Sequence, residues 1–207
     1  VGRGTITMSG SLSFGGGGNY NWQVDDASLP AGQTGSYDLV SVLGSLSIAA
    51  SSTNTFKLNL WSVIPDGSSG PAGGFDPTVS STYTLVTTSG GISGFAANKF
   101  TINTSATNGT AGFINDLAGG SFRVRQAGND LQLLFLPAGA SGGITINVAS
   151  GTQTQTQAGY PLLSGADEVT KTGAGTLVLD QANTLTASTT VQQGRVLLSN
   201  ASALSSR

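Results

Sequence analysis

Apolar and polar residues alternate in short runs from one end of the chain to the other. Clear examples are 20–24, 56–61 and 144–148. A period of two places alternate side chains on opposite faces of a β-strand. Gly, Asn, Ser or Asp separates nearly every pair of runs, as turns require, and no window keeps the i, i+3, i+4, i+7 spacing of an amphipathic helix. The pattern therefore predicts an all-β chain with almost no helix.

An all-β chain can fold as a sandwich, a closed barrel or a stacked solenoid. The solvent-facing positions of the runs are mostly Thr, Ser, Asn and Gln, and only 9% of the 207 residues are charged, whereas 31 are Gly. In a solenoid each outward residue stacks on the same position of the next coil, where like charges repel and Thr or Asn can form ladders. Glycine also suits the corners of a coil. These features favour a β-solenoid, and a β-sandwich stays open as the alternative.

The strongest sign of a repeat lies in residues 173–205. A Gly-Thr-Leu-x-Leu strand starts at Gly175, an Asn-Thr pair follows at Asn183, and a Thr-x-Val strand ends at Val191. A second glycine-led apolar strand starts at Gly194, and Asn-x-x-Ala-Leu starts at Asn200. This succession closely resembles the autotransporter-associated β-strand repeat of bacterial surface and secreted proteins.

The resemblance implies a right-handed parallel β-helix that is extracellular or displayed on a bacterial cell surface. At roughly 20–25 residues per turn, as the spacing of the runs suggests, the chain would make about nine coils. It opens on Val1 without a basic and apolar leader, which predicts a processed or excised piece of a longer polypeptide.

The chain also reads as the end of one repeat block joined to the start of another. Residues 1–137, more weakly, resemble the segment that follows such repeats in large repetitive surface proteins. Residues 138–172 would form the junction and the start of the next block, and 173–207 the repeat itself. The glycine-rich stretch 137–143 marks the seam. We therefore expect the unit to occur in a longer tandem array.

Composition excludes several kinds of chemistry. The chain has no Cys and no His, so it has no disulfide, no Cys/His zinc site, and no catalysis by imidazole or thiolate. Its net charge of −2 lacks the basic excess that nucleic-acid binding needs. No stretch reaches the roughly 20 apolar residues of a membrane-spanning helix. We expect no enzyme activity, no cofactor, no metal site and no insertion of this segment into a membrane.

Two adjacent acidic pairs, Asp25-Asp26 and Asp167-Glu168, are the only candidates for paired-carboxylate chemistry. Neighbours on a strand point to opposite faces, so neither pair converges, and we interpret both as solvated turn or strand-edge residues. The other aspartates stand beside Gly, Pro, Asn or Gln, outside any Asp-x-Asp-x-Asp-Gly calcium loop, and we interpret them as turn residues.

Two other groups could bind sugars. Arg123 and Arg125 share a strand face and could grip an acidic sugar, although a solvated face explains them as well. The aromatic residues could form a stacking platform, but their phase with neighbouring apolar residues favours core or corner packing. They are Tyr20, Trp22, Tyr37, Trp61, Tyr83 and Tyr160. The alternation Gln153–Gln157 predicts either an outer solenoid face or a flexible linker.

These observations predict a structural module of an extracellular or cell-surface β-solenoid protein, forming a stiff stalk or a self-assembling fibre. Each coil contacts only its neighbours, and the open strand edges at the two ends favour end-to-end association or tandem copies. A glycan- or surface-binding adhesin module is the alternative. A polysaccharide lyase or hydrolase is the third hypothesis, and it lacks convergent acids.

Overall fold

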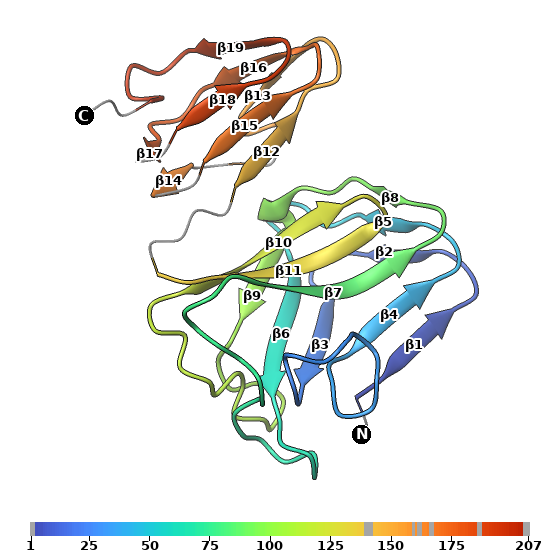
Figure 1. Cartoon of the computed structure of the whole chain (residues 1–207). Helices are drawn as coiled ribbons and strands as arrows, with labels where there is room; N and C mark the ends of the chain where they lie inside the picture. Colours follow the sequence, from blue (N-terminus) through green and yellow to red (C-terminus); the bar gives the residue numbers. More distant parts are fainter. Residues whose placement is uncertain are drawn as a thin grey trace. The chain divides into compact units, whose positions relative to one another are not determined.

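The structure is a computed structural model that describes residues 3–138, 143–158, 160, 163–165, 168–185 and 188–204. Within these residues the protein consists of β-strands, turns and one 3₁₀ helix, η1 (Ala97–Lys99), which confirms the prediction of an all-β chain (Figure 1). The chain divides into two compact units, Val1–Ala138 and Gly139–Arg207.

The first unit winds three times through the same three parallel sheets. Strands β1, β4 and β7 form the first sheet, β2, β5 and β8 the second, and β3, β6 and β9 the third. We call one passage through the three sheets a circuit. The bounds are β1 (Thr5–Met8), β2 (Leu12–Phe14), β3 (Asn19–Val24), β4 (Leu39–Val42), β5 (Leu46–Ile48), β6 (Phe56–Ser62), β7 (Ser81–Thr88), β8 (Ile92–Ser93) and β9 (Phe100–Asn103).

An antiparallel hairpin follows the third circuit. Its strands are β10 (Ser121–Ala127) and β11 (Asp130–Leu136), and β11 pairs antiparallel with β7, so the first sheet has the order β1-β4-β7-β11-β10. Phe122 and Phe135 of the hairpin contact Phe75 and Phe113, which come from the two longest loops. The hairpin therefore replaces a fourth parallel strand in this sheet, and its aromatic rings seal the core beside it.

The core of the first unit is rich in aromatic rings. Trp22 is fully buried and contacts the rings of Tyr37 and Tyr83 at centroid distances of 5.5 and 5.6 Å. Phe14 stacks on Phe56 of the next circuit at 4.1 Å. Because Phe14 precedes the β2–β3 corner and Phe56 begins β6, aromatic packing joins successive circuits as well as successive sheets.

The second unit repeats the parallel arrangement with shorter circuits. Its sheets have the orders β12-β15-β18, β13-β16-β19 and β14-β17, and every pairing is parallel. The bounds are β12 (Ile144–Asn147), β13 (Thr152–Thr154), β14 (Ser164–Gly165), β15 (Val169–Thr172), β16 (Thr176–Leu179), β17 (Thr184–Leu185), β18 (Thr189–Val191) and β19 (Arg195–Leu198). Its core is aliphatic, with buried side chains from Ile146, Val148, Leu163, Val169, Leu177, Leu179, Leu185 and Ala203.

The predicted number of coils, about nine, is not confirmed. In the first unit Thr5 pairs with Leu39, 34 residues later, and Val40 pairs with Val86, 46 residues later. Only the second unit has the predicted spacing, since Val169 is 25 residues after its partner Ile144. Long loops in the first unit, such as 63–80, lengthen its circuits, and the spacing of apolar runs did not separate loops from strands.

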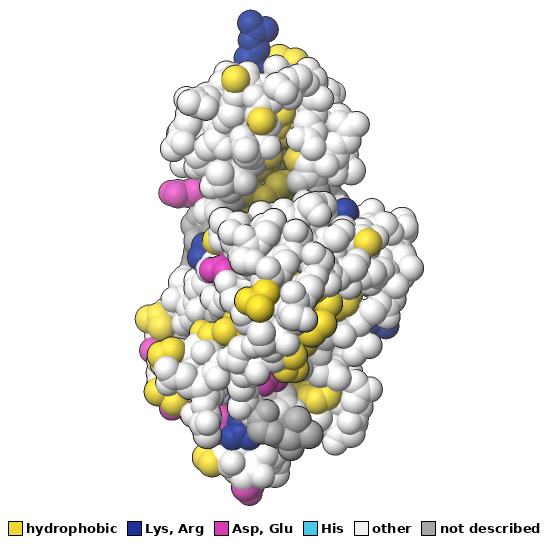
Figure 2. Space-filling view, turned by 90° about the vertical axis from the view of Figure 1, so that its right-hand side faces the viewer, with side chains coloured by type: hydrophobic (Ala, Val, Ile, Leu, Met, Phe, Trp, Pro, Cys, Tyr) yellow, Lys and Arg dark blue, Asp and Glu magenta, His cyan; other side chains and the backbone are white. Residues whose placement is uncertain are grey.

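The parallel registers also bear on the alternative architecture. A β-sandwich needs antiparallel hairpins, and among the described strands antiparallel pairing is confined to β7-β11-β10. The assignment of 1–137, 138–172 and 173–207 to repeat blocks stays a prediction, and most of the seam, 139–142, lies outside the described residues. The surface visible in Figure 2 is largely uncharged, with scattered apolar side chains, as the low charge content requires.

Candidate functional site

An open polar pocket of about 220 Å³ lies on the outer face of the sheet formed by β3, β6 and β9. We call it the asparagine groove. It is lined by Gly17, Asn19, Lys57, Asn59, Asn103, Thr107 and Asn108. The strands supply Asn19, Lys57, Asn59 and Asn103, and the loop after β9 supplies Thr107 and Asn108.

A ladder of asparagine side chains crosses the three strands beside this groove. Asn21 of β3, Asn59 of β6 and Asn103 of β9 are in register. The amide of Asn59 donates to Oδ1 of Asn21 at 2.7 Å, and Asn103 donates to Oδ1 of Asn59 at 3.4 Å. Stacked amides of this kind satisfy one another along a parallel sheet. The ladder therefore fixes the orientation of two of the lining amides, those of Asn59 and Asn103.

The loop after β9 closes one side of the groove. Thr107 accepts a hydrogen bond from the indole nitrogen of Trp61 at 2.8 Å, and Asn108 donates to Oδ1 of Asn21 at 3.5 Å. Asn108 has a φ of 50°, a left-handed conformation that Asn adopts more readily than most residues. The groove thus combines amide and hydroxyl groups with the exposed ammonium of Lys57, which suits hydrogen bonding to a polar ligand.

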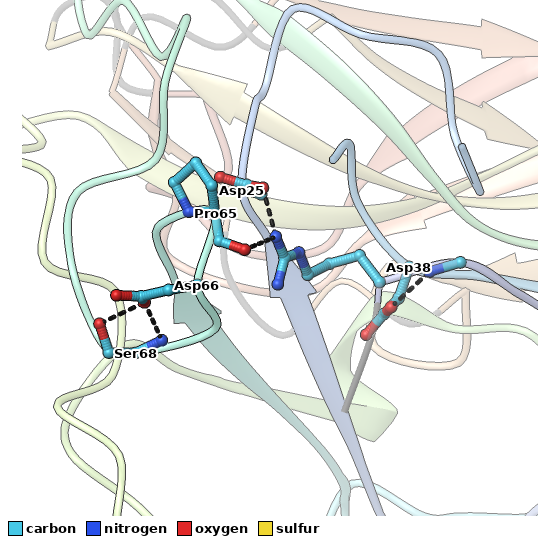
Figure 3. Close-up of polar contacts among 7 residues, drawn as sticks. Asp25, Asp38, Pro65, Asp66 and Ser68 are labelled. Carbon is cyan, nitrogen blue, oxygen red and sulfur yellow. Dashed lines mark hydrogen bonds and ion pairs between the residues drawn. The ribbon is translucent and has the colours of Figure 1, made fainter. Parts of the chain in front are cut away.

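A buried ionic network lies at the start of the first unit (Figure 3). The guanidinium of Arg3 pairs with the carboxylate of Asp25, and both side chains are only 8% exposed. Arg3 also donates to the carbonyl oxygen of Pro65 at 3.3 Å, while its Nε is buried without a partner. The network joins three segments that are far apart in the sequence. Removing either member of the pair would leave the other charge buried and uncompensated.

Asp38 and Tyr20 complete this region. Asp38 accepts hydrogen bonds from the backbone N–H groups of Gln23 at 3.0 Å and Gly4 at 3.2 Å. Burial nevertheless raises the pKa of Asp38, and the two N–H donors and Arg3 only reduce the effect. Burial also raises the pKa of Tyr20, to which the charge of Asp38 adds, and the Tyr20 hydroxyl is buried without a partner. The carboxyl and the phenol are held by backbone and packing, and no lining residue of the asparagine groove is among them.

The structure separates the predicted acidic pairs. Asp25 is 7% exposed, so its interpretation as a solvated residue is wrong: the pairing with Arg3, 22 residues away, carries it into the protein. Asp26 accepts hydrogen bonds from the backbone and the hydroxyl of Ser28, which lower its pKa, as in a turn. Asp167 lies outside the described residues.

The same Asx turn recurs at several of the other aspartates. Asp66 binds Ser68 in this way and Asp76 binds Thr78, and these hydrogen bonds lower the pKa of each carboxyl. Asp116 accepts from the backbone N–H of Ala118 at 2.9 Å. These aspartates act as turn residues, as their sequence neighbours predicted.

The aromatic residues do not form an exposed platform. Trp22, Tyr37, Trp61 and Tyr83 are all at most 8% exposed, which confirms the interpretation as core or corner packing. Trp61 points to the outer face of its strand but is covered by the loop that carries Thr107. Stacking of a sugar on these rings would require the loops above them to move.

Arg123 and Arg125 both belong to β10. The guanidinium of Arg125 donates to Gln132 of β11 at 2.9 Å and to Thr82 of β7 at 3.3 Å. These contacts run across the outer face of the first sheet. They support the interpretation of Arg125 as part of a solvated face.

Sequence reasoning missed the polar groups inside the second unit. Gln155 is fully buried, and its amide exchanges hydrogen bonds with that of Asn183 at 2.7 and 2.8 Å, so neither a linker nor an outer face describes this residue. Asn183 also accepts from the N–H of Leu163 and donates to the carbonyl of Ala203, both at 2.9 Å. One amide therefore links three successive circuits. The match of Asn183 to the repeat was the available signal.

Lys171 is the second buried polar group that was missed. It occupies an inward position of β15, and its ammonium donates to the carbonyls of Thr172, Gly173 and Gln193 at 2.6, 2.7 and 3.1 Å. All three N–H donors are thus used at a corner of the coil. The side chain neutralises carbonyl dipoles where two circuits turn.

Two searches of the described residues bear on the predicted absences. No group of three or more acidic, His or Cys side chains is placed to hold a metal ion in that part of the chain. No helix there is both long and apolar enough to cross a membrane. The expectation that the chain has no enzyme activity stays a prediction.

One comparison with known proteins gave a match. Residues 169–198 match the family model of the passenger-associated-transport-repeat. The matched range runs from the first residue of β15 to the last residue of β19. It confirms the resemblance of this end of the chain to the autotransporter-associated repeat. No curated protein and no solved structure matches the chain.

Proposed function

We propose that the chain is a structural module of a passenger-type bacterial surface or secreted protein, and that it serves as a stiff, protease-resistant segment of a right-handed β-solenoid. The passenger-associated-transport-repeat at 169–198 supports the passenger-type assignment and the extracellular location. The two units then act as stacked spacers that separate whatever lies before them from whatever follows.

The observation that carries this proposal is the parallel register. Each strand of a circuit pairs with the corresponding strand of the next circuit, as for Val40 with Val86 and Val169 with Thr189. Parallel crossovers are right-handed in nearly all known cases. Stacking at about 4.8 Å per circuit gives length without a large core, because each circuit contacts only its neighbours.

Proteolysis and a display experiment test the proposal together. The folded chain is expected to survive hours with a broad-specificity protease while a urea-unfolded sample is degraded. Inserted between a membrane anchor and a fluorescent reporter, one, two and four copies should raise the reporter above the membrane by equal steps. Rapid degradation of the folded chain, or a reporter height independent of copy number, would refute the structural role.

A second candidate function is glycan binding in the asparagine groove. It is supported by the in-register amides of Asn59 and Asn103 beside the Lys57 ammonium. Amide groups in fixed orientation match the hydroxyl pairs of sugars, and the ammonium favours acidic ones.

Titration of neutral and uronic-acid oligosaccharides by calorimetry tests this function. Asn108→Ala together with Lys57→Ala should abolish any binding, whereas Asn54→Ala, an exposed amide outside the groove, should not. Binding that survives the double substitution would place the ligand elsewhere.

A further inference from the structure

The first circuit leaves its inward-facing residues uncovered. Ile6 is in register with Val40 and Met8 with Val42. Val40 and Val42 are 8% and 1% exposed, whereas Ile6 and Met8 are 61% and 37% exposed. The same columns of side chains are buried one circuit later, so the exposure arises because no circuit precedes β1.

The last described circuit shows the same feature at the other end of the chain. Leu198 of β19 is in register with Leu179, and the two are 56% and 0% exposed. Val191 of β18 is in register with Lys171, and these are 47% and 0% exposed. Both ends of the described chain therefore present apolar columns that stop without a cover.

The corner of the first circuit contains space for a preceding corner. A Cβ added at Gly44 would lie 2.8 Å from the backbone nitrogen of Ser11, and one at Gly90 would lie 3.0 Å from that of Ser45. Each glycine thus lets its corner rest on the corner of the circuit before it. Gly10 occupies the same position in the first circuit, and a Cβ there would meet nothing within 4 Å.

The edge strands lack the usual protection against pairing. Residues 5–14 contain no charged residue and no proline, and residues 189–198 contain only Arg195. Natural edge strands are commonly blocked by charges, prolines or bulges, and unblocked ones pair with another chain. Figure 2 views the molecule from the side on which β1 lies in Figure 1, and that surface has apolar patches and few charges.

From these observations we propose that β1 and β2 of one copy dock on β18 and β19 of a second copy, as the next parallel circuit of one continuous solenoid. This deepens the structural role proposed above, on which it rests, by naming the partner and the two surfaces. Gly10 then lies on the corner 192–194, and Ile6 and Leu198 become buried in the joint.

Direction and corner length select this pairing. Successive circuits add on the carboxyl-terminal side, so the free edge of β18 and β19 faces forward and that of β1 and β2 faces backward. Three residues separate β1 from β2 and β18 from β19, as in 43–45 and 173–175, whereas four separate β12 from β13. The contact joins two different surfaces and therefore generates open filaments.

Charged substitutions on the two edges test the proposal by sedimentation velocity over a range of concentrations. The unaltered chain should associate into a ladder of species. Ile6→Lys blocks only the first edge and Leu198→Lys only the last, and both sites are exposed enough to accept a lysine in the isolated fold. Each variant alone should stay monomeric, with association at least about tenfold weaker, because the joint would bury an unpaired charge. An equimolar mixture of the two should give a dimer and nothing larger.

Val79→Lys, at a loop residue 50% exposed, is the matched control and should associate like the unaltered chain. Association of Ile6→Lys alone, association of Leu198→Lys alone, a monomeric unaltered chain, or no dimer in the mixture would each overturn the docking. Circular dichroism and protease resistance separate this outcome from failure of the structural role. A folded, resistant monomer retains that role and refutes only the docking.

Discussion

The two units wind in the same way but fill their interiors differently. In the first, circuits are offset by 34 and 46 residues, the core contains Trp, Tyr and Phe rings, and an antiparallel hairpin follows the last circuit. In the second, the circuits are offset by 25 and 20 residues and the core is aliphatic. Parallel stacking therefore does not fix the length of a circuit.

The difference teaches where each unit obtains its uniqueness. Wide circuits with long loops are closed by rings that reach across the interior and by loops that cover the sheets. Narrow circuits have less apolar area to bury, and buried amides and an ammonium specify their register instead. The hairpin, with its aromatic rings, closes the sheet β1-β4-β7 to further parallel strands, whereas β18 and β19 stay open.

The largest expected effect is on the aromatic core of the first unit. Trp22→Ala should lower the free energy of unfolding by about 3–5 kcal/mol, because it removes a fully buried ring and its hydrogen bond to the carbonyl of Asp38. Urea unfolding followed by the fluorescence of Trp61 measures it, since both tryptophans belong to this unit. Leu43→Ala, at a 59% exposed corner, should change little. A cost below about 1 kcal/mol for Trp22→Ala would show that the rings do not hold this unit together.

A polar substitution should weaken the second unit instead. Asn183→Ala leaves the amide of Gln155, the N–H of Leu163 and the carbonyl of Ala203 without their partner, so we expect a loss of about 1–3 kcal/mol. Hydrogen exchange read by mass spectrometry should show faster exchange in 143–204 and unchanged exchange in the first unit.

Gln181→Ala is the matched control, because this exposed amide makes a single contact, to Thr156. If both substitutions have equal effects on exchange, the buried amide link contributes no more than a surface contact. If Asn183→Ala speeds exchange in the first unit as well, the contrast between the two interiors is wrong.

A glycine pair compares two corners of similar sequence. Gly44→Ala brings a Cβ against the backbone of Ser11 and should cost about 1–3 kcal/mol, because two backbones must separate. Gly10→Ala meets nothing within 4 Å and should leave stability unchanged or raise it by up to about 1 kcal/mol, through the unfolded chain. Thermal unfolding of both variants measures the difference. Equal costs would show that circuits do not nest through their corners.

Local patterns in the sequence predicted the strands, the corners and the repeat, because alternation and glycine placement act over a few residues. The burial of Trp22 and Tyr83 followed from their phase with neighbouring apolar residues. The hairpin was not predicted, because β10 alternates like any other strand and only pairing with β11 and β7 makes it antiparallel.

Polar pairings across circuits were beyond the sequence for a similar reason. Arg3 meets Asp25 only after a full sheet has formed between them, and Gln155 meets Asn183 one circuit later. The ladder of Asn21, Asn59 and Asn103 had a signal, since each follows an apolar residue at an outward position of a run. Recognising it required the register, which loops of unequal length conceal.

The smallest expected effect concerns a turn in a long loop of the first unit. Asp76 binds the N–H of Thr78 at 2.8 Å and its hydroxyl at 2.7 Å, and these bonds hold the pKa of the carboxyl below its ordinary 3.8. A lowered pKa means that the anion stabilises the folded state above pH 3.8, and that this contribution disappears as the pH falls through the folded-state pKa. The loop carries Phe75 into the aromatic cluster, so a weaker turn loosens that contact as well.

Asp76→Ala should therefore lower the urea midpoint at pH 7, and the gap to the unaltered chain should narrow below pH 3.8. Asp76→Asn keeps a neutral acceptor and should show a gap smaller than that of Asp76→Ala at pH 7. The fluorescence of the two tryptophans reports each midpoint. A gap for Asp76→Ala that stays constant across this range would mean that the carboxylate charge contributes nothing, and that the turn depends on the shape of the loop alone.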